Sequence, residues 1–258
     1  MFRTAERMAG RCTDHFVTVA QAMTEMSLRA GIQKAGNYTR IFSGFDLDPF
    51  LAAKRDEAFR RELGFAPDDF VIGKLARLTR LKGHDDLLEA APEILQRIPS
   101  ARFLLIGDGN WWGRLRRKAA DLGVAESVVF RGLIPPSAVP SHLAQCDVLV
   151  HLSRREGLPR SLPQAMSVGL PVVAYDCDGA REVCLERETG FLLPAGDVKG
   201  LGDRLVELAD NPELCVRFGR SGRNLVRRNF SVELMVDQLA GLYERLWKER
   251  NGMSPAAR

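Results

Sequence analysis

The stretch CDVLVHLSRREGLPRSLPQAMSVGLPVVAY, residues 146–175, decides the fold class of this chain. It contains two short apolar runs, DVLVHLS at 147–153 and PVVAY at 171–175, with a segment of helical spacing between them. Runs that are apolar at consecutive positions and are bounded by Gly, Pro or charge are typical of buried parallel strands. We therefore expect a strand–helix–strand unit here.

The same alternation extends to both sides of this unit. Amphipathic stretches separate further apolar runs, which occupy 70–76, 102–107, 128–132 and 190–194. This regularity predicts an α/β fold, a Rossmann-like doubly wound parallel sheet over residues 69–228.

The first part of the chain follows a different pattern. Runs at 15–20 and 39–44 indicate strands with a helix at 21–30 between them, and 47–68 indicates a linker with a short helix. Two strands do not form a stable domain alone. They either extend the main sheet or are the remnant of a second domain.

The last part, residues 229–258, indicates an amphipathic helix and a frayed tail at 253–258. Ser231 can cap this helix, because its hydroxyl can accept a hydrogen bond from an amide of the first turn. The apolar stripe of the helix consists of Met235, Leu239, Leu242 and Leu246.

Composition excludes several classes of protein. The 258 residues include 37 Lys and Arg against 33 Asp and Glu, a net charge of +4, which is too small for a nucleic-acid-binding stripe. No apolar run approaches the ~20 residues of a membrane span. The five cysteines form no Cys-x-x-Cys pair, so we expect no disulfide framework, no metal site and a cytoplasmic location.

Cofactor motifs are absent from the sequence as well. It contains neither G-x-G-x-x-G nor G-x-x-x-x-G-K-[ST], which argues against NAD and against ATP bound by a P-loop. We predict that the protein uses no cofactor.

Ligands of an open parallel sheet bind beyond the carboxyl ends of its strands, so the loops there carry the candidate residues. Arg77 and Lys82 follow the first strand run, and Gly83 lets the chain turn into a helix whose first amides attract anions. The pair suits a diphosphate, and a solvated basic loop is the alternative. Glu156 follows the fourth run and can accept hydrogen bonds from the hydroxyls of a polyol.

Five motifs stand in one order along the chain. They are GKLARLTRLKGH at 73–84, FLLIGDG at 103–109, VVFRG at 128–132, CDVLVHLSRREG at 146–157 and AMSVGLPVVAYDCDGAREV at 165–183. This ordered set resembles glycosyltransferase family 4, retaining enzymes with two Rossmann-like domains in the arrangement called the GT-B fold. The likeness runs from about Asp14 to Leu246 and includes IFSGFD at 41–46, which is similar to the segment that joins the two domains.

The resemblance implies a role for each matching residue. Arg77 and Lys82 match the basic pair on the donor diphosphate, and Glu156 matches the first acid of the E-x7-E motif, against the donor sugar. These three are the catalytic candidates. Gly132 and Leu133 match the loop that meets the nucleotide base.

Four more substrate-binding candidates lie near Glu156. The turn of Gly157, Leu158 and Pro159 would offer amides to sugar and phosphate. Gln164 replaces the second acid of the motif, which holds the ribose hydroxyls in the family. Its amide accepts one bond and donates another, and it loses a charge-assisted contribution of about 1 kcal/mol.

Besides Gln164, the chain departs from the family in its first, acceptor-binding domain, because residues 1–46 resemble only a remnant of that N-terminal Rossmann-like domain. The C-terminal helix within residues 229–258 resembles the family's element that crosses back to the first domain. We therefore expect a donor-binding half that self-associates and whose missing N-terminal domain acts in cis or in trans. The implied partners are a nucleoside diphosphate sugar and a saccharide or lipid-linked acceptor. The alternative to a purely cytoplasmic protein is peripheral contact with the inner face of the membrane.

Three functions stay open at this point. The first is sugar transfer with retention, the second is binding of a nucleotide sugar without turnover, and the third is a nucleotide-sugar epimerase of similar architecture. Arg77, Lys82 and Glu156 all match the family's positions, and this match favours sugar transfer over epimerisation.

For the remaining conspicuous residues we favour structural roles. Trp111 and Trp112 are followed by basic residues. They could form a patch that binds an acceptor or a membrane surface, but we favour ordinary packing. We expect Gly179 and Glu182 to shape the turn after the run at 171–175.

Overall fold

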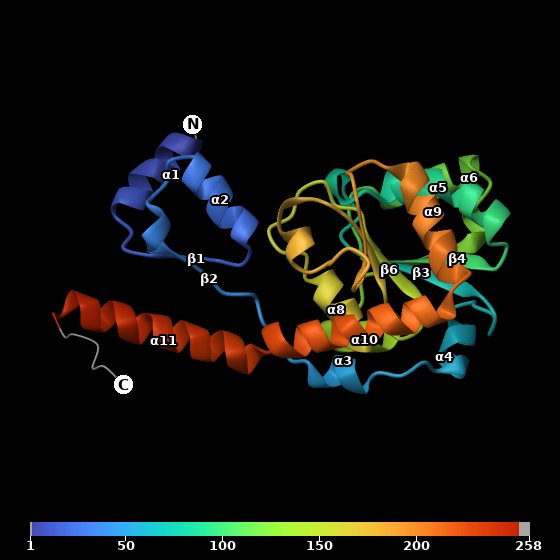
Figure 1. Ribbon diagram of the computed structural model, residues 1–258. Helices are drawn as coiled ribbons and strands as arrows, with labels where there is room; N and C mark the ends of the chain where they lie inside the picture. Colours follow the sequence, from blue (N-terminus) through green and yellow to red (C-terminus); the bar gives the residue numbers. More distant parts are fainter. Residues whose placement is uncertain (1, 253–258) are drawn as a thin grey trace.

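The six apolar runs form one parallel sheet in the computed structural model, which describes residues 2–252 (Figure 1). Its strands are β3 (Phe70–Leu75), β4 (Ala101–Ile106), β5 (Val128–Gly132), β6 (Val148–His151), β7 (Val172–Tyr175) and β8 (Gly190–Leu193). They lie in the order β5-β4-β3-β6-β7-β8, and all neighbours are parallel. The predicted α/β fold and its parallel sheet are confirmed.

This strand order creates a switch point between β3 and β6. The chain adds β4 and β5 on one side of β3, then crosses back and adds β6, β7 and β8 on the other side. The two central strands pair at Ile72 with Val148 and at Gly73 with Leu149. The loops that follow them diverge, so the crevice that binds ligands in such sheets lies between these loops.

Helices cover both faces of the sheet (Figure 1). One face carries α5 (His84–Arg97), α6 (Trp112–Asp121) and α9 (Val198–Ala209), and the other carries α7 (Val139–Leu143) and α8 (Ser161–Val168). The long helix α10 (Pro212–Asn229) packs on both α8 and α9. Because successive strand residues point to opposite faces, Ile72 and Val71 belong to different apolar cores. We call residues 70–229 the sheet domain.

The chain also forms short segments of 3-10 helix. They are η1 (Ala35–Asn37), η2 (Arg80–Lys82), η3 (Ala125–Ser127), η4 (Pro136–Ala138) and η5 (Asp178–Glu182).

The segment 47–68 forms two short helices, α3 (Asp48–Ala52) and α4 (Glu57–Glu62), rather than one. Its buried apolar residues Leu47, Phe50, Leu63 and Phe65 belong to the core under α8. The segment therefore contributes to the core of the sheet domain.

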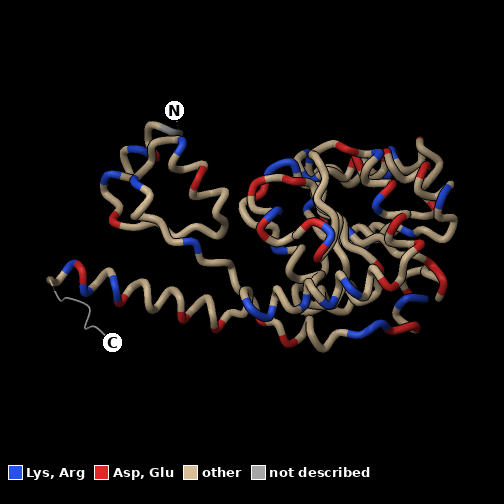
Figure 2. Tube along the Cα trace, viewed as in Figure 1, with Lys and Arg blue, Asp and Glu red and all other residues tan. Residues whose placement is uncertain are grey.

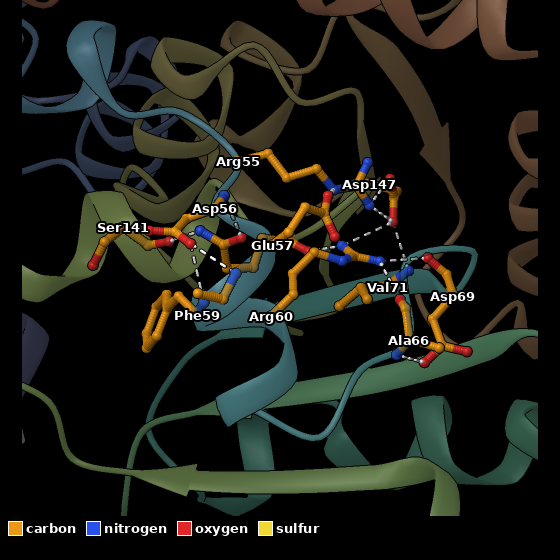
Figure 3. Close-up of polar contacts among 12 residues, drawn as sticks. Arg55, Asp56, Glu57, Phe59, Arg60, Ala66, Asp69, Val71, Ser141 and Asp147 are labelled. Atoms are coloured by element: carbon orange, nitrogen blue, oxygen red, sulfur yellow. Dashed lines mark hydrogen bonds and ion pairs between the residues drawn. The ribbon is translucent and has the colours of Figure 1, made fainter.

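A fully buried arginine anchors this segment at the amino ends of the central strands (Figure 3). Arg60 donates hydrogen bonds to the backbone oxygens of Gln145 and Asp69, at 2.5 and 2.7 Å. Its guanidinium lies 3.8 Å from the carboxylate of Asp147. That carboxylate also pairs with Arg55, at 3.1 Å. One cation thus ties α4 to the residues that precede β3 and β6.

Residues 2–46 form a separate unit, which we call the N-terminal lobe (Figure 1). It contains α1 (Phe2–Arg11), β1 (Phe16–Thr18), α2 (Gln21–Arg29) and β2 (Tyr38–Arg40). The two strands pair in parallel with each other and not with the six-stranded sheet. The alternative in which they extend the main sheet is therefore wrong.

Helix α1 is not among the predicted elements. Contacts with residues distant in sequence hold it: Arg7 Nε donates to the carbonyl of Ala30 at 2.6 Å, and Gln33 Nε2 donates to the carbonyl of Gly10 at 2.9 Å. A Cβ on Gly10 would lie 2.4 Å from the carbonyl oxygen of Ile32, so the helix and the following loop approach closely. A local sequence pattern does not report such contacts.

The last described helix, α11 (Val232–Arg250), extends from the sheet domain along the N-terminal lobe (Figure 1). Ser231 Oγ accepts a hydrogen bond from the amide of Leu234 at 3.1 Å, as predicted. Leu242 of the predicted stripe is buried, whereas Val236, Tyr243 and Trp247 are exposed. The predicted tail at 253–258 lies outside the described residues.

The last two observations concern membrane-spanning helices and the distribution of charge. Among residues 2–252, no helix combines the length and the apolarity that a membrane span requires. Basic and acidic positions are interspersed along the whole trace (Figure 2).

Candidate functional site

A cavity of about 1010 Å³ opens at the switch point of the sheet. Arg77 and Lys82 line it from the loop after β3, and Glu156 lines it from the loop after β6. The structure thus brings the three predicted catalytic candidates into one cavity. Gly83, which begins α5, also lines it, so the amino end of that helix faces the same space.

Lys82 and Glu156 form an ion pair across this cavity. Their side chains are 15% and 25% exposed, so each charge is largely shielded from water by its partner and the cavity wall. The two loops are joined directly, because the amide of Arg154 donates to the carbonyl of Leu81 at 2.9 Å.

Gly83 makes the close approach of the two loops possible. It adopts a φ of 64°, in the left-handed region, and a Cβ there would lie 2.0 Å from the carbonyl oxygen of Leu152. Only glycine fits this backbone conformation and this contact without strain. The position of Lys82 against the end of β6 therefore depends on Gly83.

Buried polar residues support the loop after β3. His84 Nε2 lies 3.0 Å from the carbonyl oxygen of Arg77 and donates to it, since a carbonyl can only accept. Burial, together with the nearby Lys74, lowers the pKa of His84 to about 3, so its ring is neutral at pH 7. Burial also lowers the pKa of Lys74 on β3 to about 7. His84 thereby fixes the backbone that carries Arg77.

Several cavity residues were not among the predicted site residues. Four of them are basic, Arg80, Arg114, Arg154 and Arg155, and two are acidic, Asp85 and Asp86. Arg154 is held by the buried carboxylate of Asp86, at 2.8 Å. The sequence SRREG at 153–157 could have identified Arg154 and Arg155, because both directly precede Glu156. The excess of cations makes the cavity suited to an anionic ligand.

The tryptophan pair is divided between the cavity and the core. Trp111 lines the cavity, and the guanidinium carbon of Arg114 lies 4.2 Å from the centre of its ring. Trp112 packs edge-on against Phe130, with ring centroids 5.6 Å apart. Both side chains are half-buried, in line with the packing interpretation.

The six predicted substrate-binding residues do not line the cavity. Gly132 ends β5 with a φ of 76°, and Leu133 after it is 82% exposed. Leu158 and Pro159 are buried, and Gln164 on α8 is half-buried. The carbonyl of Gly157 accepts a hydrogen bond from the amide of Gly179 at 3.1 Å. The cavity unites only the catalytic candidates.

Among the described residues, no group of three or more His, Cys, Asp or Glu side chains is placed to hold a metal ion. The buried cysteines are not poised as nucleophiles either. Burial raises the pKa of Cys177 to about 12 and holds that of Cys184 far above its usual range.

Comparison with known proteins places this fold and these loops in a family. The model of the family "Glycosyl transferases group 1" matches residues 55–225. A GDP-mannose-dependent alpha-(1-6)-phosphatidylinositol monomannoside mannosyltransferase of Mycolicibacterium smegmatis is 32% identical over 247 residues. That match covers 93% of this chain and 64% of the relative, so the chain spans about two thirds of the relative's length.

Solved structures of glycosyltransferases have a similar fold. HepE of Anabaena in complex with UDP and glucose superposes with a TM-score of 0.86 and 25% identity, over 94% of this chain and 66% of that one. Sucrose-phosphate synthase of Thermosynechococcus elongatus gives a TM-score of 0.85 over 96% of this chain and 62% of that one, at 24% identity. The fold thus matches GT-B glycosyltransferase structures. Because the family model matches well over half of its residues, the chain belongs to the glycosyl transferases of group 1.

Proposed function

We propose that this chain is the donor-binding part of a retaining glycosyltransferase of family 4, which moves a sugar from a nucleoside diphosphate to an acceptor hydroxyl. The observation that carries the proposal is the convergence of Arg77, Lys82 and Glu156 in one cavity at the switch point. Two cations, the amino end of α5 and one carboxylate are the groups that a diphosphate joined to a polyol requires.

The proposed chemistry follows from these charges. As the bond between the anomeric carbon and the diphosphate oxygen breaks, negative charge increases on the departing diphosphate. Arg77 and Lys82 stabilise that charge at fixed positions, which is the largest contribution in many such sites. Glu156 accepts hydrogen bonds from sugar hydroxyls and orients the anomeric carbon.

The other predicted residues complete the donor site in this proposal. Gly132 and Leu133 meet the nucleotide base, the turn of Gly157, Leu158 and Pro159 contacts the sugar and phosphate, and Gln164 holds the ribose. For these residues to meet the ligand, the donor extends from the cavity toward the ends of β5 and α8.

The acceptor is a saccharide or a lipid-linked molecule, as the phosphatidylinositol mannoside in the name of one relative suggests. A lipid acceptor would bring the protein to the inner face of the membrane. The chain spans 64% of that relative, so we propose that an acceptor-binding half acts with it, in cis or in trans. Without that half, the chain holds the nucleotide sugar and transfers nothing.

Calorimetry with UDP and GDP tests the donor site, and transfer assays with lipid and saccharide acceptors test the reaction. We expect the 258-residue chain to bind one of the two nucleotides at high micromolar Kd or tighter. Transfer should require the added acceptor half and be lost in Glu156→Gln. Failure of both nucleotides to bind would overturn the proposed function. Sustained transfer by the purified monomer would overturn the requirement for a second half.

A further inference from the structure

The short segment η5 lies between the candidate site and the N-terminal lobe and contacts both. On the site side, Asp178 Oδ2 accepts a hydrogen bond from the amide of Glu156 at 2.7 Å. The next residue, Gly179, donates its amide to the carbonyl of Gly157 at 3.1 Å. Two successive residues of η5 thus hold the backbone of the Glu156–Gly157 turn.

The far end of η5 holds the N-terminal lobe through Glu182. One carboxylate oxygen accepts from the amide of Gln21 at 2.9 Å, and the other accepts from the amide of Ala22 at 3.1 Å. These are the first two amides of α2, which have no partner within the helix. A carboxylate at this end also interacts favourably with the helix dipole.

Helix α2 has no cap of its own. The residue at its N-cap position is Ala20, whose side chain has no hydrogen-bonding group. The cap comes instead from a residue 160 positions further along the chain, in the other unit of the molecule. Arg40 of β2 adds a second contact from the lobe, 3.9 Å from the same carboxylate.

The three segments also touch through small residues. A Cβ on Gly179 would lie 2.4 Å from the carbonyl oxygen of Gly157 and 2.7 Å from the Cβ of Ala20. A Cβ on Gly157 would lie 3.0 Å from the sulfur of Met23 on α2. The lobe, η5 and the turn that carries Glu156 are therefore in close contact, and a side chain at Gly179 would not fit between them.

We propose that Glu182 is a positioning residue, which sets the N-terminal lobe against the sheet domain, and that η5 passes the position of the lobe to Glu156. Asp178 is the other end of this link. It adopts a φ of 43°, which is unfavourable for a residue other than glycine, and its contact with the amide of Glu156 accompanies that conformation. The consequence for sugar transfer rests on the proposed function, whereas the placement of the lobe does not.

Spin-label distances test the placement directly. Arg29 on α2 and Lys199 on α9 have side chains that are each 81% exposed, so both accept a label as cysteines in a Cys12→Ser background. We expect Glu182→Gln and Glu182→Ala to at least double the width of the distance distribution. The amides of Gln21 and Ala22 should exchange at least tenfold faster with deuterium.

Glu186→Gln is the matched control. Glu186 is also a carboxylate close to η5 that accepts a backbone hydrogen bond, from Leu192 at 2.7 Å, but both partners belong to the sheet domain. This variant should leave the distance distribution unchanged. The proposal is wrong if the Glu182 variants give the same distance distribution as Glu186→Gln. Faster amide exchange in the Glu182 variants with unchanged distances would mean that Glu182 is only a helix cap.

Kinetics test the link to Glu156 in the enzyme completed with its acceptor half. Glu182→Ala should lower kcat at least tenfold and should change the KM for the donor by a smaller factor, because Arg77 and Lys82 belong to the loop after β3 and not to the turn that η5 holds. Equal kcat for Glu182→Ala and Glu186→Gln would overturn the link. If the wild type binds neither UDP nor GDP and the distance distribution still broadens, the proposed function fails and the positioning role stands.

Discussion

Lys82 and Glu156 form an ion pair across the switch point of the sheet, although 74 positions separate them in the sequence. Each side chain thus neutralises the other. In the proposed donor site, a diphosphate would compete with Glu156 for the ammonium group, and the released carboxylate would become available to the sugar hydroxyls. We therefore expect binding of the phosphate and binding of the sugar to be coupled through this one pair.

Replacement of Lys82 by alanine should weaken binding of UDP or GDP, whichever the chain prefers. The loss of a charged hydrogen bond corresponds to about 1.5–3 kcal/mol, or roughly 10–150-fold in Kd. Calorimetry measures the change. Lys199→Ala, an exposed lysine on α9, is the control and should leave Kd within twofold. Equal affinities for wild type and Lys82→Ala would remove Lys82 from the donor site.

Glu156→Gln should have opposite effects on the free diphosphate and on transfer. Without its negative charge, residue 156 competes less for Lys82, so UDP or GDP should bind more tightly by about 0.5–1.5 kcal/mol. Transfer by the completed enzyme should fall, because the sugar loses its carboxylate acceptor. Calorimetry and a transfer assay on the same preparation separate the two effects. Weaker nucleotide binding in this variant would contradict the competition.

Binding and transfer should not require a divalent ion. Six cations line the cavity, among them Arg77, Lys82 and Arg154, and they outnumber its three carboxylates, so they can balance the charge of a diphosphate. Kd and transfer rate, each measured before and after treatment with EDTA, should agree within error. Activity that disappears with chelator and returns with magnesium would show this prediction to be wrong.

Arg60→Ala should destabilise the sheet domain strongly, because Arg60 is fully buried and binds two backbone carbonyls beside Asp147. Removal of one partner of a buried charged network costs about 3–5 kcal/mol. Arg55→Ala removes the exposed partner of the same carboxylate and should cost about 0.2–1 kcal/mol. Urea denaturation measures both. Similar losses for the two variants would contradict the burial argument.

Acid should destabilise the protein partly through His151. Burial lowers the pKa of this ring to about 3 in the folded state, against an ordinary value of 6.5. Between these values the unfolded chain binds the additional proton, so stability falls as the pH falls below 6.5. The contribution is about 1.4 kcal/mol per pH unit. In urea denaturation between pH 6 and 4.5, His151→Asn should show a slope smaller by that amount, and an unchanged slope would contradict the prediction.

The sequence by itself determined the elements of the sheet domain and the catalytic candidates. Each of the six strands is a short run that is apolar at consecutive positions, and burial on both faces leaves that pattern in any parallel sheet. The loops that carry Arg77, Lys82 and Glu156 follow such runs, so their location at the carboxyl edge also followed from the sequence. Ser231 was predictable as a cap, because its hydroxyl accepts from the amide of Leu234, only three residues further on in the same helix.

The tertiary structure alone decided which of these residues meet. The pair of Lys82 with Glu156, the support of Arg154 by Asp86 and the cap that Glu182 provides for α2 each join segments far apart in the chain. Helix α1 escaped prediction because its stabilising contacts come from outside the helix. A sequence pattern reports local conformation and burial, which depend on near neighbours. The partner of a charge depends on strand order and loop packing, and these exist only in the folded chain.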